Sequence, residues 1–240
     1  MWPSPPAALR VLLVGGPNVG KSTLFNALTG ARQHTTNAPG TTVELATGTW
    51  RTGGRSAGGR VVAGQAAASS ATERAIVDLP GTYSLLARSA DEQVTADAVQ
   101  ELAAGFGQGS RQQGVVVVVL DATALSRSLY PLAQVAETGV PLVVALTMLD
   151  LSAATTASPT ASMAPQALAA SLGVPVIPVD SRNRTDGGLR RLAHAVDAVG
   201  EHPRRVTGIP APEVAFSPIM PTRSLTRRPS SRGSRRSPPP

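Results

Sequence analysis

One segment near the N-terminus restricts the possible folds more than any other. Residues 15–22 have the sequence GGPNVGKS, which fits the phosphate-binding pattern G-x-x-x-x-G-K-[S/T]. The apolar residues 9–14 before it predict a buried strand, and residues 21–29 predict a helix that ends at Gly30. In this context the glycines let backbone N–H groups face an anion at the positive end of the helix. The alternative is an ordinary glycine-rich turn, but a chance match to the whole pattern is rare.

The lysine of this loop, Lys21, is the only lysine among the 22 basic residues of the chain. Because every other basic residue of the chain is Arg, the retained lysine indicates a site that needs a compact, flexible ammonium group. We therefore expect Lys21 to reach the β- and γ-phosphate oxygens of a nucleotide. The Ser22 hydroxyl is expected to bind Mg²⁺.

The net charge of +7 suggests nucleic-acid binding until the charges are located. Residues 204–240 contain eight Arg and one acid, so the excess lies in this segment and the rest of the chain is neutral. No nucleic-acid partner is expected, although a basic arm that contacts lipid headgroups or nucleic acid stays an alternative for the tail. Without Cys the chain has no disulfides, cysteine-ligated zinc or thiol catalysis. The scattered His34, His194 and His202 predict no metal site.

Strand-like and helix-like segments alternate between residues 9 and 200. Strands are predicted at 9–14, 43–50, 75–78, 115–120, 140–146 and 174–179, and helices at 21–29, 91–104, 126–138, 165–172 and 187–199. The alternation predicts an α/β fold with a doubly wound, mostly parallel six-stranded sheet and helices on both faces. Hydrophobic residues make up 42% of the chain and aromatic ones 3%, so the core is expected to be aliphatic.

Three parts are expected along the chain. They are a Pro-rich leader at 1–8, a nucleotide-binding domain at 9–200 with a Gly/Ala/Ser-rich insertion at 51–74, and a disordered Arg/Pro/Ser-rich tail at 201–240. The tail is interpreted as the product of a truncation or a change of reading frame. No apolar run approaches the roughly 18–20 residues that span a bilayer, and no signal peptide is evident. A cytoplasmic chain without a membrane span is therefore expected.

A second phosphate-site pattern, D-x-x-G, follows the third predicted strand. Asp78 at the end of that strand can hold Mg²⁺ through water, and the Gly81 N–H can meet a γ-phosphate. Thr42, in the polar loop predicted at residues 35–42, is the expected second hydroxyl for Mg²⁺. A turn or capping role for Thr42 is the alternative, because Thr41 lies beside it.

Several segments together resemble the G domain of the ferrous iron transport protein B (FeoB) family. They are GPNVGKSTLFNALTG at 16–30, PGTTVE at 39–44, DLPGTYSL at 78–85, DAT at 121–123 with LY at 129–130, GVP at 139–141 and ALTMLD at 145–150. The phosphate loop is shared by many GTPases, whereas DLPGTYSL and the DAT…LY segment distinguish this family. The resemblance covers about residues 9 to 199.

The resemblance implies a P-loop GTPase with a Ras-like fold that binds GTP or GDP with Mg²⁺ and couples nucleotide state to iron uptake. The residues it implies for nucleotide binding are Gly15, Gly16, Pro17, Asn18, Val19, Gly20, Lys21, Ser22, Thr23, Pro39, Gly40, Thr41, Thr42, Asp78, Leu79, Pro80, Gly81, Thr147, Met148, Leu149, Asp150 and Ser181. The family continues into a helical regulatory domain and a membrane domain that conducts Fe²⁺, which are not found in this sequence. A membrane iron-permease domain or subunit is thus a possible partner.

Two departures from the family affect base recognition. Guanine is usually bound by N-x-x-D, and residues 147–150 have the sequence TMLD. Asp150 can still accept hydrogen bonds from guanine, but Thr147 lacks the amide that ties the base loop to the phosphate loop, so guanine preference is expected to weaken. The second base-binding turn, S-A-[R/K] in many relatives, falls near residues 180–182, where only Ser181 is a candidate.

The expected catalytic group consists of Lys21, Asn18, Thr42 and Gly81. Thr82 stands where many small GTPases place a water-orienting Gln, so intrinsic hydrolysis is expected to be slow. Asn18 occupies the position at which potassium-activated relatives have an Asn ligand, and a K⁺ ion there would supply positive charge in the transition state. The alternative is that Asn18 only tolerates a left-handed backbone.

Two other functions fit the same motifs. A soluble GTPase of ribosome assembly or tRNA modification would share the phosphate-loop Asn, although no RNA-binding domain is evident. A nucleotide-binding fragment with negligible hydrolysis is the second alternative.

Overall fold

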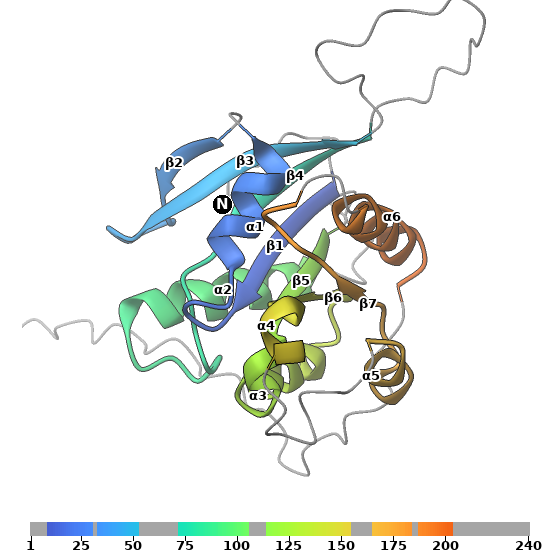
Figure 1. The fold of residues 1–240 in the computed structure, drawn as a ribbon. Helices are drawn as coiled ribbons and strands as arrows, with labels where there is room; N and C mark the ends of the chain where they lie inside the picture. Colours follow the sequence, from blue (N-terminus) through green and yellow to red (C-terminus); the bar gives the residue numbers. More distant parts are fainter. Residues whose placement is uncertain are drawn as a thin grey trace, which may run out of the picture. The chain divides into compact units, whose positions relative to one another are not determined.

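The computed structural model describes residues 9–30, 33–52, 72–105, 114–154, 165–183 and 187–203, which all lie in one compact unit, Met1–Pro210. A sheet of seven strands organises this unit, in the order β2-β3-β4-β1-β5-β6-β7 (Figure 1). The strands are β1 (Leu9–Gly15), β2 (Gln33–Asn37), β3 (Glu44–Thr52), β4 (Thr72–Asp78), β5 (Gly114–Asp121), β6 (Leu142–Thr147) and β7 (Val176–Pro178). The helices are α1 (Lys21–Thr29), α2 (Ala90–Gly105), η1 (Ala122–Ala124), α3 (Leu125–Glu137), α4 (Leu149–Ala154), α5 (Pro165–Leu172) and α6 (Gly188–Glu201).

The strand directions bring the candidate motifs to one edge of the sheet. β1 pairs in parallel with β4 and β5, β5 with β6, and β6 with β7, whereas β3 is antiparallel to both β2 and β4. The carboxyl ends of β1, β4, β5, β6 and β7 therefore meet at the same edge. In open α/β sheets, ligands bind in the crevice outside this edge.

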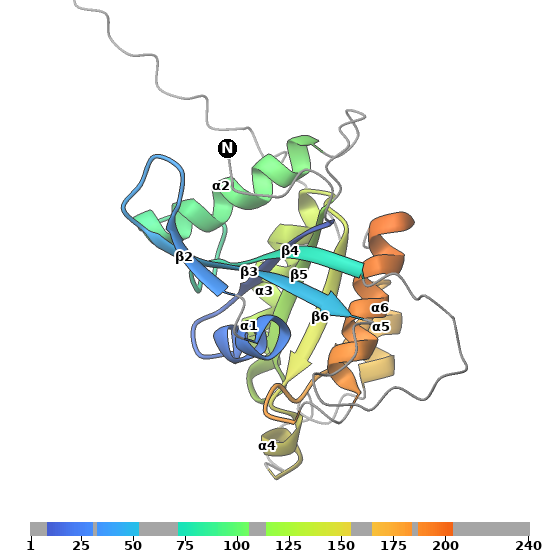
Figure 2. The same cartoon turned by 90° about the horizontal axis from the view of Figure 1, so that it is seen from above.

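Two hydrophobic layers cover the two faces of the sheet. In β5, Val116, Val118 and Leu120 face the layer that contains α2, α3 and α5, while Val115, Val117 and Val119 face the layer with α1 and α6. Side chains alternate along a strand, so a run of apolar residues is buried on both faces. Figure 2 shows α1 and α2 on opposite sides of the sheet. These features confirm the predicted doubly wound α/β class.

A buried arginine joins the sheet to α6. Arg74 in β4 is fully buried, and its guanidinium donates to both carboxylate oxygens of Asp197, with 2.7 Å from Nε to Oδ1. A third bond, 3.0 Å long, reaches the Thr52 hydroxyl. The guanidinium carbon lies 4.7 Å from the ring centroid of Trp50, which is also buried.

The structure differs from the prediction at the polar edge of the sheet. Residues 35–42 were expected to be a loop, but residues 33–37 form β2, the seventh strand, and residues 38–43 form the turn to β3. The sequence QHTTN has no apolar alternation, since this edge strand is held by its backbone ladder with β3. β3 and β4 also extend into the expected insertion, to Thr52 and from Thr72.

The remaining parts of the predicted domain scheme lie outside the described residues. These are the leader at 1–8, most of the insertion (53–71) and residues 204–240 of the tail. Within the described ranges, no helix has the length and apolarity needed to cross a membrane.

Candidate functional site

The phosphate loop joins β1 to α1 and carries the charged residues expected at a nucleotide site. Asn18 and Gly20 have positive φ angles of 62° and 85°, and α1 begins at Lys21. The Lys21 side chain is nearly buried, and its ammonium contacts Oδ1 of Asp78 at the end of β4. The Ser22 hydroxyl donates to Oδ2 of the same carboxylate at 2.7 Å. Three residues predicted from two separate motifs thus meet in one cluster.

The loop after β4 lies directly on the phosphate loop. The Thr82 N–H donates to the Gly15 carbonyl at 3.0 Å. A Cβ atom on Gly81 would lie 3.0 Å from the Cα of Pro17, and one on Gly16 would lie 2.9 Å from the ring of Tyr83. Both glycines therefore permit a contact between the two loops that a larger residue would obstruct.

Thr82 is turned away from the phosphate loop by its own hydrogen bonds. Its hydroxyl contacts the Ser84 carbonyl and lies 3.3 Å from a Glu92 carboxylate oxygen, and the side chain is buried. The Ser84 N–H donates back to this hydroxyl at 3.0 Å. The side chain is thus committed to the loop after β4.

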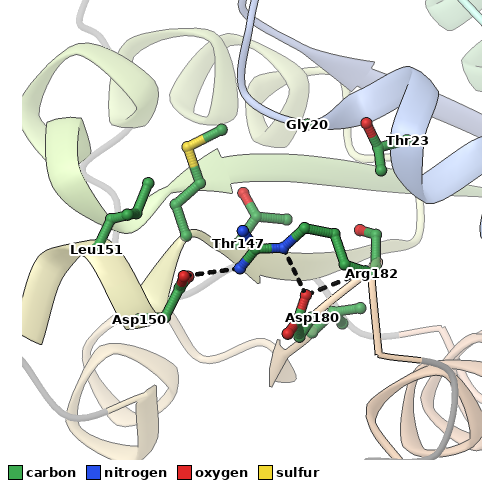
Figure 3. A pocket seen from close by; sticks show the side chains of 10 residues that line it. Gly20, Thr23, Thr147, Asp150, Leu151, Asp180 and Arg182 are labelled. Carbon is green, nitrogen blue, oxygen red and sulfur yellow. Dashed lines mark hydrogen bonds and ion pairs between the residues drawn. The ribbon is translucent and has the colours of Figure 1, made fainter.

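Two adjoining cavities open at the carboxyl edge of the sheet. The larger, about 470 Å³, lies at the phosphate loop and is lined by Gly16, Pro17, Asn18, Gly20, Lys21, Ser22, Thr23, Gly81 and Met148. The smaller, about 120 Å³, is lined by Gly20, Thr23, Thr147, Met148, Asp150, Leu151, Val179, Asp180, Ser181 and Arg182 (Figure 3). Gly20, Thr23 and Met148 belong to both, so one elongated ligand can occupy the two cavities together.

Thr147 corrects one expectation from the sequence. Its hydroxyl lies 2.8 Å from the Val19 carbonyl in the phosphate loop and 2.9 Å from the Leu120 carbonyl at the end of β5. Thr147 is buried, and it ends β6. The tether between the base loop and the phosphate loop, which was expected to be missing without an Asn, is therefore made by a threonine hydroxyl.

The smaller cavity contains a bridge of three charged side chains. Arg182 donates to Oδ2 of Asp150 at 2.6 Å through one terminal nitrogen, and through Nε to Oδ1 of Asp180 at 3.2 Å. The hydrogen bond from Arg182 lowers the pKa of the Asp150 carboxyl from its ordinary value. The Arg182 backbone N–H, followed by its side chain, lowers the pKa of Asp180 in the same way. Both carboxylates are therefore ionised at neutral pH.

The residues predicted in the turn between β2 and β3 do not line these two cavities. Pro39, Gly40, Thr41 and Thr42 lie in that turn, where the Thr41 hydroxyl donates to the Ala38 carbonyl at 3.2 Å. Thr42 is exposed there. A Mg²⁺ role for Thr42 would therefore require this turn to move toward the phosphate loop.

Some predicted nucleotide-binding residues have side chains in the hydrophobic layers. Val19 and Leu79 are buried in the core, and Leu149 packs against it. The Pro80 carbonyl accepts a bond from Thr95 at 3.0 Å. The three apolar side chains position the loops, so only their backbones are suited to contact a ligand.

Several residues of the site were not predicted from the sequence, and Leu151 and Val179 of the smaller cavity are among them. Arg182 and Asp180 line the smaller cavity together with the predicted Ser181. The basic residue at the third position of the S-A-[R/K]-like turn was the available signal for Arg182. Tyr83, whose ring covers Gly16, lies in the DLPGTYSL segment but was assigned no contact. Among the described residues, no group of three or more His, Asp or Glu side chains could hold a metal ion.

Known proteins resemble this chain in both sequence and fold. The chain is 37% identical over 194 residues to the "Fe(2+) transporter FeoB" of Shigella flexneri, covering 79% of this chain and 21% of that protein. The cytosolic domain of L. pneumophila FeoB is 32% identical, with a TM-score of 0.61 over 84% of this chain and 66% of that one. The G domain of T. maritima FeoB is 30% identical, with a TM-score of 0.58 over 80% of this chain and 98% of that one.

A family profile extends the comparison across the described domain. The profile described as "Ferrous iron transport protein B" matches residues 9–196. The chain spans about a fifth of the length of the curated relatives it matches. On the combined sequence and structural matches, this chain belongs to the ferrous iron transport protein B family, with the fold of its G domain.

Proposed function

We propose that this chain binds GTP with Mg²⁺ and hydrolyses it as the G domain of a ferrous iron transporter, with its nucleotide state coupled to iron uptake. The observation that carries the proposal is the cluster of Lys21, Ser22 and Asp78 at the carboxyl edge of the sheet. Solved relatives support it, since one is an S. thermophilus protein bound to GDP and another a T. maritima cytosolic domain in a GMPPNP form.

The phosphate end of the site fits a nucleotide with a divalent cation. The Ser22 hydroxyl and the Asp78 carboxylate lie together and are hard oxygen donors of the kind Mg²⁺ prefers, so Ser22 would hold the ion and Asp78 would hold it through water. When bound, Mg²⁺ would neutralise charge on the β- and γ-phosphates. Lys21 would then exchange the Asp78 carboxylate for phosphate oxygens, and backbone N–H groups of residues 18–22 would cradle the β-phosphate.

The base end of the site offers a carboxylate for guanine. Asp150 would accept the N1 and N2 hydrogens of the base, which adenine cannot provide in that arrangement. The backbone N–H of Ser181 would lie on the same side of the cavity, and Thr147 would hold the base loop against the phosphate loop through Val19. We therefore infer a preference for guanine over adenine nucleotides.

Hydrolysis is proposed to be slow and stimulated by K⁺. The Thr82 side chain is committed to Ser84 and Glu92, so it would not orient the attacking water. Exposed Asn18, which lines the larger cavity, would hold K⁺ together with phosphate oxygens and carbonyls of the turn at residues 38–43. Positive charge there would act where negative charge develops in the transition state.

Replacement of Lys21 by Ala tests the phosphate site. Calorimetry with GTP and Mg²⁺ should find that affinity collapses, because the ammonium no longer meets the phosphate oxygens. Arg51→Ala is the matched control, since it removes an exposed cation of β3 that lines neither cavity. Undiminished GTP affinity in Lys21→Ala would contradict the proposed site.

The K⁺ proposal predicts a faster rate in KCl than in NaCl at equal ionic strength and saturating GTP. An increase of about tenfold corresponds to about 1.4 kcal/mol of barrier. Asn18→Gly is the sharpest variant, because glycine tolerates the φ of 62° and removes only the amide. If the K⁺ effect persists in Asn18→Gly, the residue serves the backbone alone. Negligible turnover in both salts would indicate a binding fragment.

Coupling to iron uptake is proposed through a membrane iron-permease domain or subunit, with this domain on the cytoplasmic side. The proposal is supported by the name of the Shigella flexneri relative, a Fe²⁺ transporter, and by the cytosolic origin of the L. pneumophila domain. Cells that carry Lys21→Ala at the native locus should take up less labelled Fe²⁺ than wild-type cells. Equal uptake would separate this chain from iron transport and would leave the proposal that it binds and hydrolyses GTP untouched.

A further inference from the structure

In the smaller cavity the guanidinium of Arg182 is paired with Asp150, the carboxylate that is expected to bind the base. Figure 3 shows the Arg182 side chain crossing the cavity, with its guanidinium between Asp150 and Asp180. The bond to Asp150 is 2.6 Å long and the bond to Asp180 is 3.2 Å long. Asp150 lies in α4 and Arg182 in the turn after β7, so this bridge joins two separate elements that line the cavity.

The chemistry of the two donors is similar. A guanidinium presents adjacent N–H groups in one plane, and it pairs with carboxylates through two roughly parallel bonds. The edge of guanine formed by N1–H and the 2-amino group presents the same donor pattern. A carboxylate oxygen that already accepts a short bond from Arg182 is less available to guanine.

We propose that Arg182 competes with guanine for Asp150, so that its guanidinium occupies the base-binding carboxylate until the base displaces it. This inference rests on the proposed guanine-nucleotide site and names a device that regulates it. Arg182 thereby sets how fast a guanine nucleotide is captured.

Asp180 makes this competition reversible. The Arg182 backbone N–H donates to Oδ1 of Asp180 at 3.0 Å, and Nε donates to the same oxygen. Arg182 can therefore release Asp150 while its backbone N–H and its Nε stay bound to Asp180. Asp180 serves as the resting partner of the displaced guanidinium.

The exposure of the bridge limits its strength. The side chains of Arg182 and Asp150 are 63% and 50% exposed, and ion pairs of this kind are weak. If the bridge is present in most molecules, the affinity for guanine nucleotides is the intrinsic affinity multiplied by the fraction of molecules in which Asp150 is available. From the strength of exposed pairs we expect a factor of about two to five.

The test is nucleotide capture by Arg182→Gln, measured by stopped flow with a fluorescent GDP. Association should be about two to five times faster than in the wild type, with dissociation unchanged, because the bridge belongs to the free protein. Arg190→Gln, which changes an exposed arginine in the first turn of α6, is the matched control for losing one positive charge. The proposal would be overturned if Arg182→Gln associated with GDP more slowly than the wild type or at the same rate. It would also be overturned if only the dissociation rate changed.

Repeating the Arg182→Gln comparison in an Asp150→Asn protein tests whether Asp150 is the group for which Arg182 and the base compete. Asp150→Asn removes the carboxylate, and its amide can donate to the 2-oxo group of xanthine. With xanthosine diphosphate, Arg182→Gln should give no gain in the Asp150→Asn protein. An equal gain there would show that Arg182 acts through another group. If neither the wild type nor Arg182→Gln binds GDP, the proposed function itself fails.

Discussion

Thr147 shows how a single hydroxyl can fix the position of two loops. It lies at the end of β6, and within hydrogen-bonding distance of carbonyls in the phosphate loop and at the end of β5. Buried carbonyls that lose such a donor are costly, because water cannot replace it. The hydroxyl therefore couples the base end of the site to its phosphate end.

Thr147→Val should destabilise the protein by about 1–2 kcal/mol, since it keeps the shape of the side chain and removes the donor. GDP affinity should fall with it, because the base loop is no longer tied to Val19. Urea unfolding and calorimetry measure the two effects. Thr147→Ser, which keeps the hydroxyl, is the control and should retain most of the affinity. A Val variant with wild-type stability and affinity would show that the tether is unimportant.

The sequence predicts the residues of this site better than their partners. Lys21, Ser22 and Asp78 follow from two motifs whose spacing reflects the fold, and the structure brings them together. Thr147 was predicted as a site residue, but its bond to Val19 depends on a distance across the folded chain. Arg182 could not be paired with Asp150 from the sequence, because the two residues are 32 positions apart and belong to different elements.

At the scale of elements, Arg74 ties the antiparallel part of the sheet to α6. Its guanidinium is fully buried and bonds to Asp197 of the helix and Thr52 of β3. The other cation in this ladder, Arg51, pairs with Glu73 at the surface. Arg51–Glu73 is an exposed cross-strand pair, whereas the neighbouring Arg74 is buried and joins the sheet to α6.

Asp197→Asn should lower the free energy of unfolding by about 3 kcal/mol, because it leaves a buried guanidinium without its counter-charge. Glu73→Gln is the control and should cost less than about 1 kcal/mol, since both partners of its pair are exposed. Both values can be taken from urea denaturation. Similar costs in the two variants would contradict a structural role for the buried bridge.

The same distinction applies to helices and strands: those marked by a local sequence pattern were predicted, and those that depend on contacts elsewhere in the fold were not. β1, β5 and β6 are apparent as apolar runs because both of their faces are buried. β2 was predicted as loop, since its polar residues are held by pairing with β3 and not by burial. The short α4 was not predicted, because six residues contain too few turns for a helical pattern.

At the scale of the whole molecule, the charges expected to meet a nucleotide already have partners within the chain. Lys21 contacts Asp78, and Asp150 accepts from Arg182. A nucleotide that binds across both cavities would replace these internal pairs with bonds to its phosphates and base. Binding therefore exchanges one set of charge pairs for another.

A ligand that binds only the folded protein stabilises it by mass action. GDP with Mg²⁺ at about 100 times its Kd should add about 2.7 kcal/mol. For a domain of this size we expect the Tm to rise by about 5–10 °C in a thermal melt. ADP at the same concentration should give a smaller rise, because adenine lacks the N1 and N2 hydrogens that the proposed contact with Asp150 requires. Equal shifts with both nucleotides would contradict that selection.

The burial of Trp50 beside Arg74 has an optical consequence. The chain has two tryptophans, and Trp50 pairs with Arg74 across the ladder that joins the turn at residues 38–43 to Asp78. An indole shielded from water and held next to a cation emits differently from one in solvent. With Trp2 replaced by Phe, Trp50 is the single tryptophan of the chain, and its emission, excited selectively over the two tyrosines, reports on β3 and β4 without an added label.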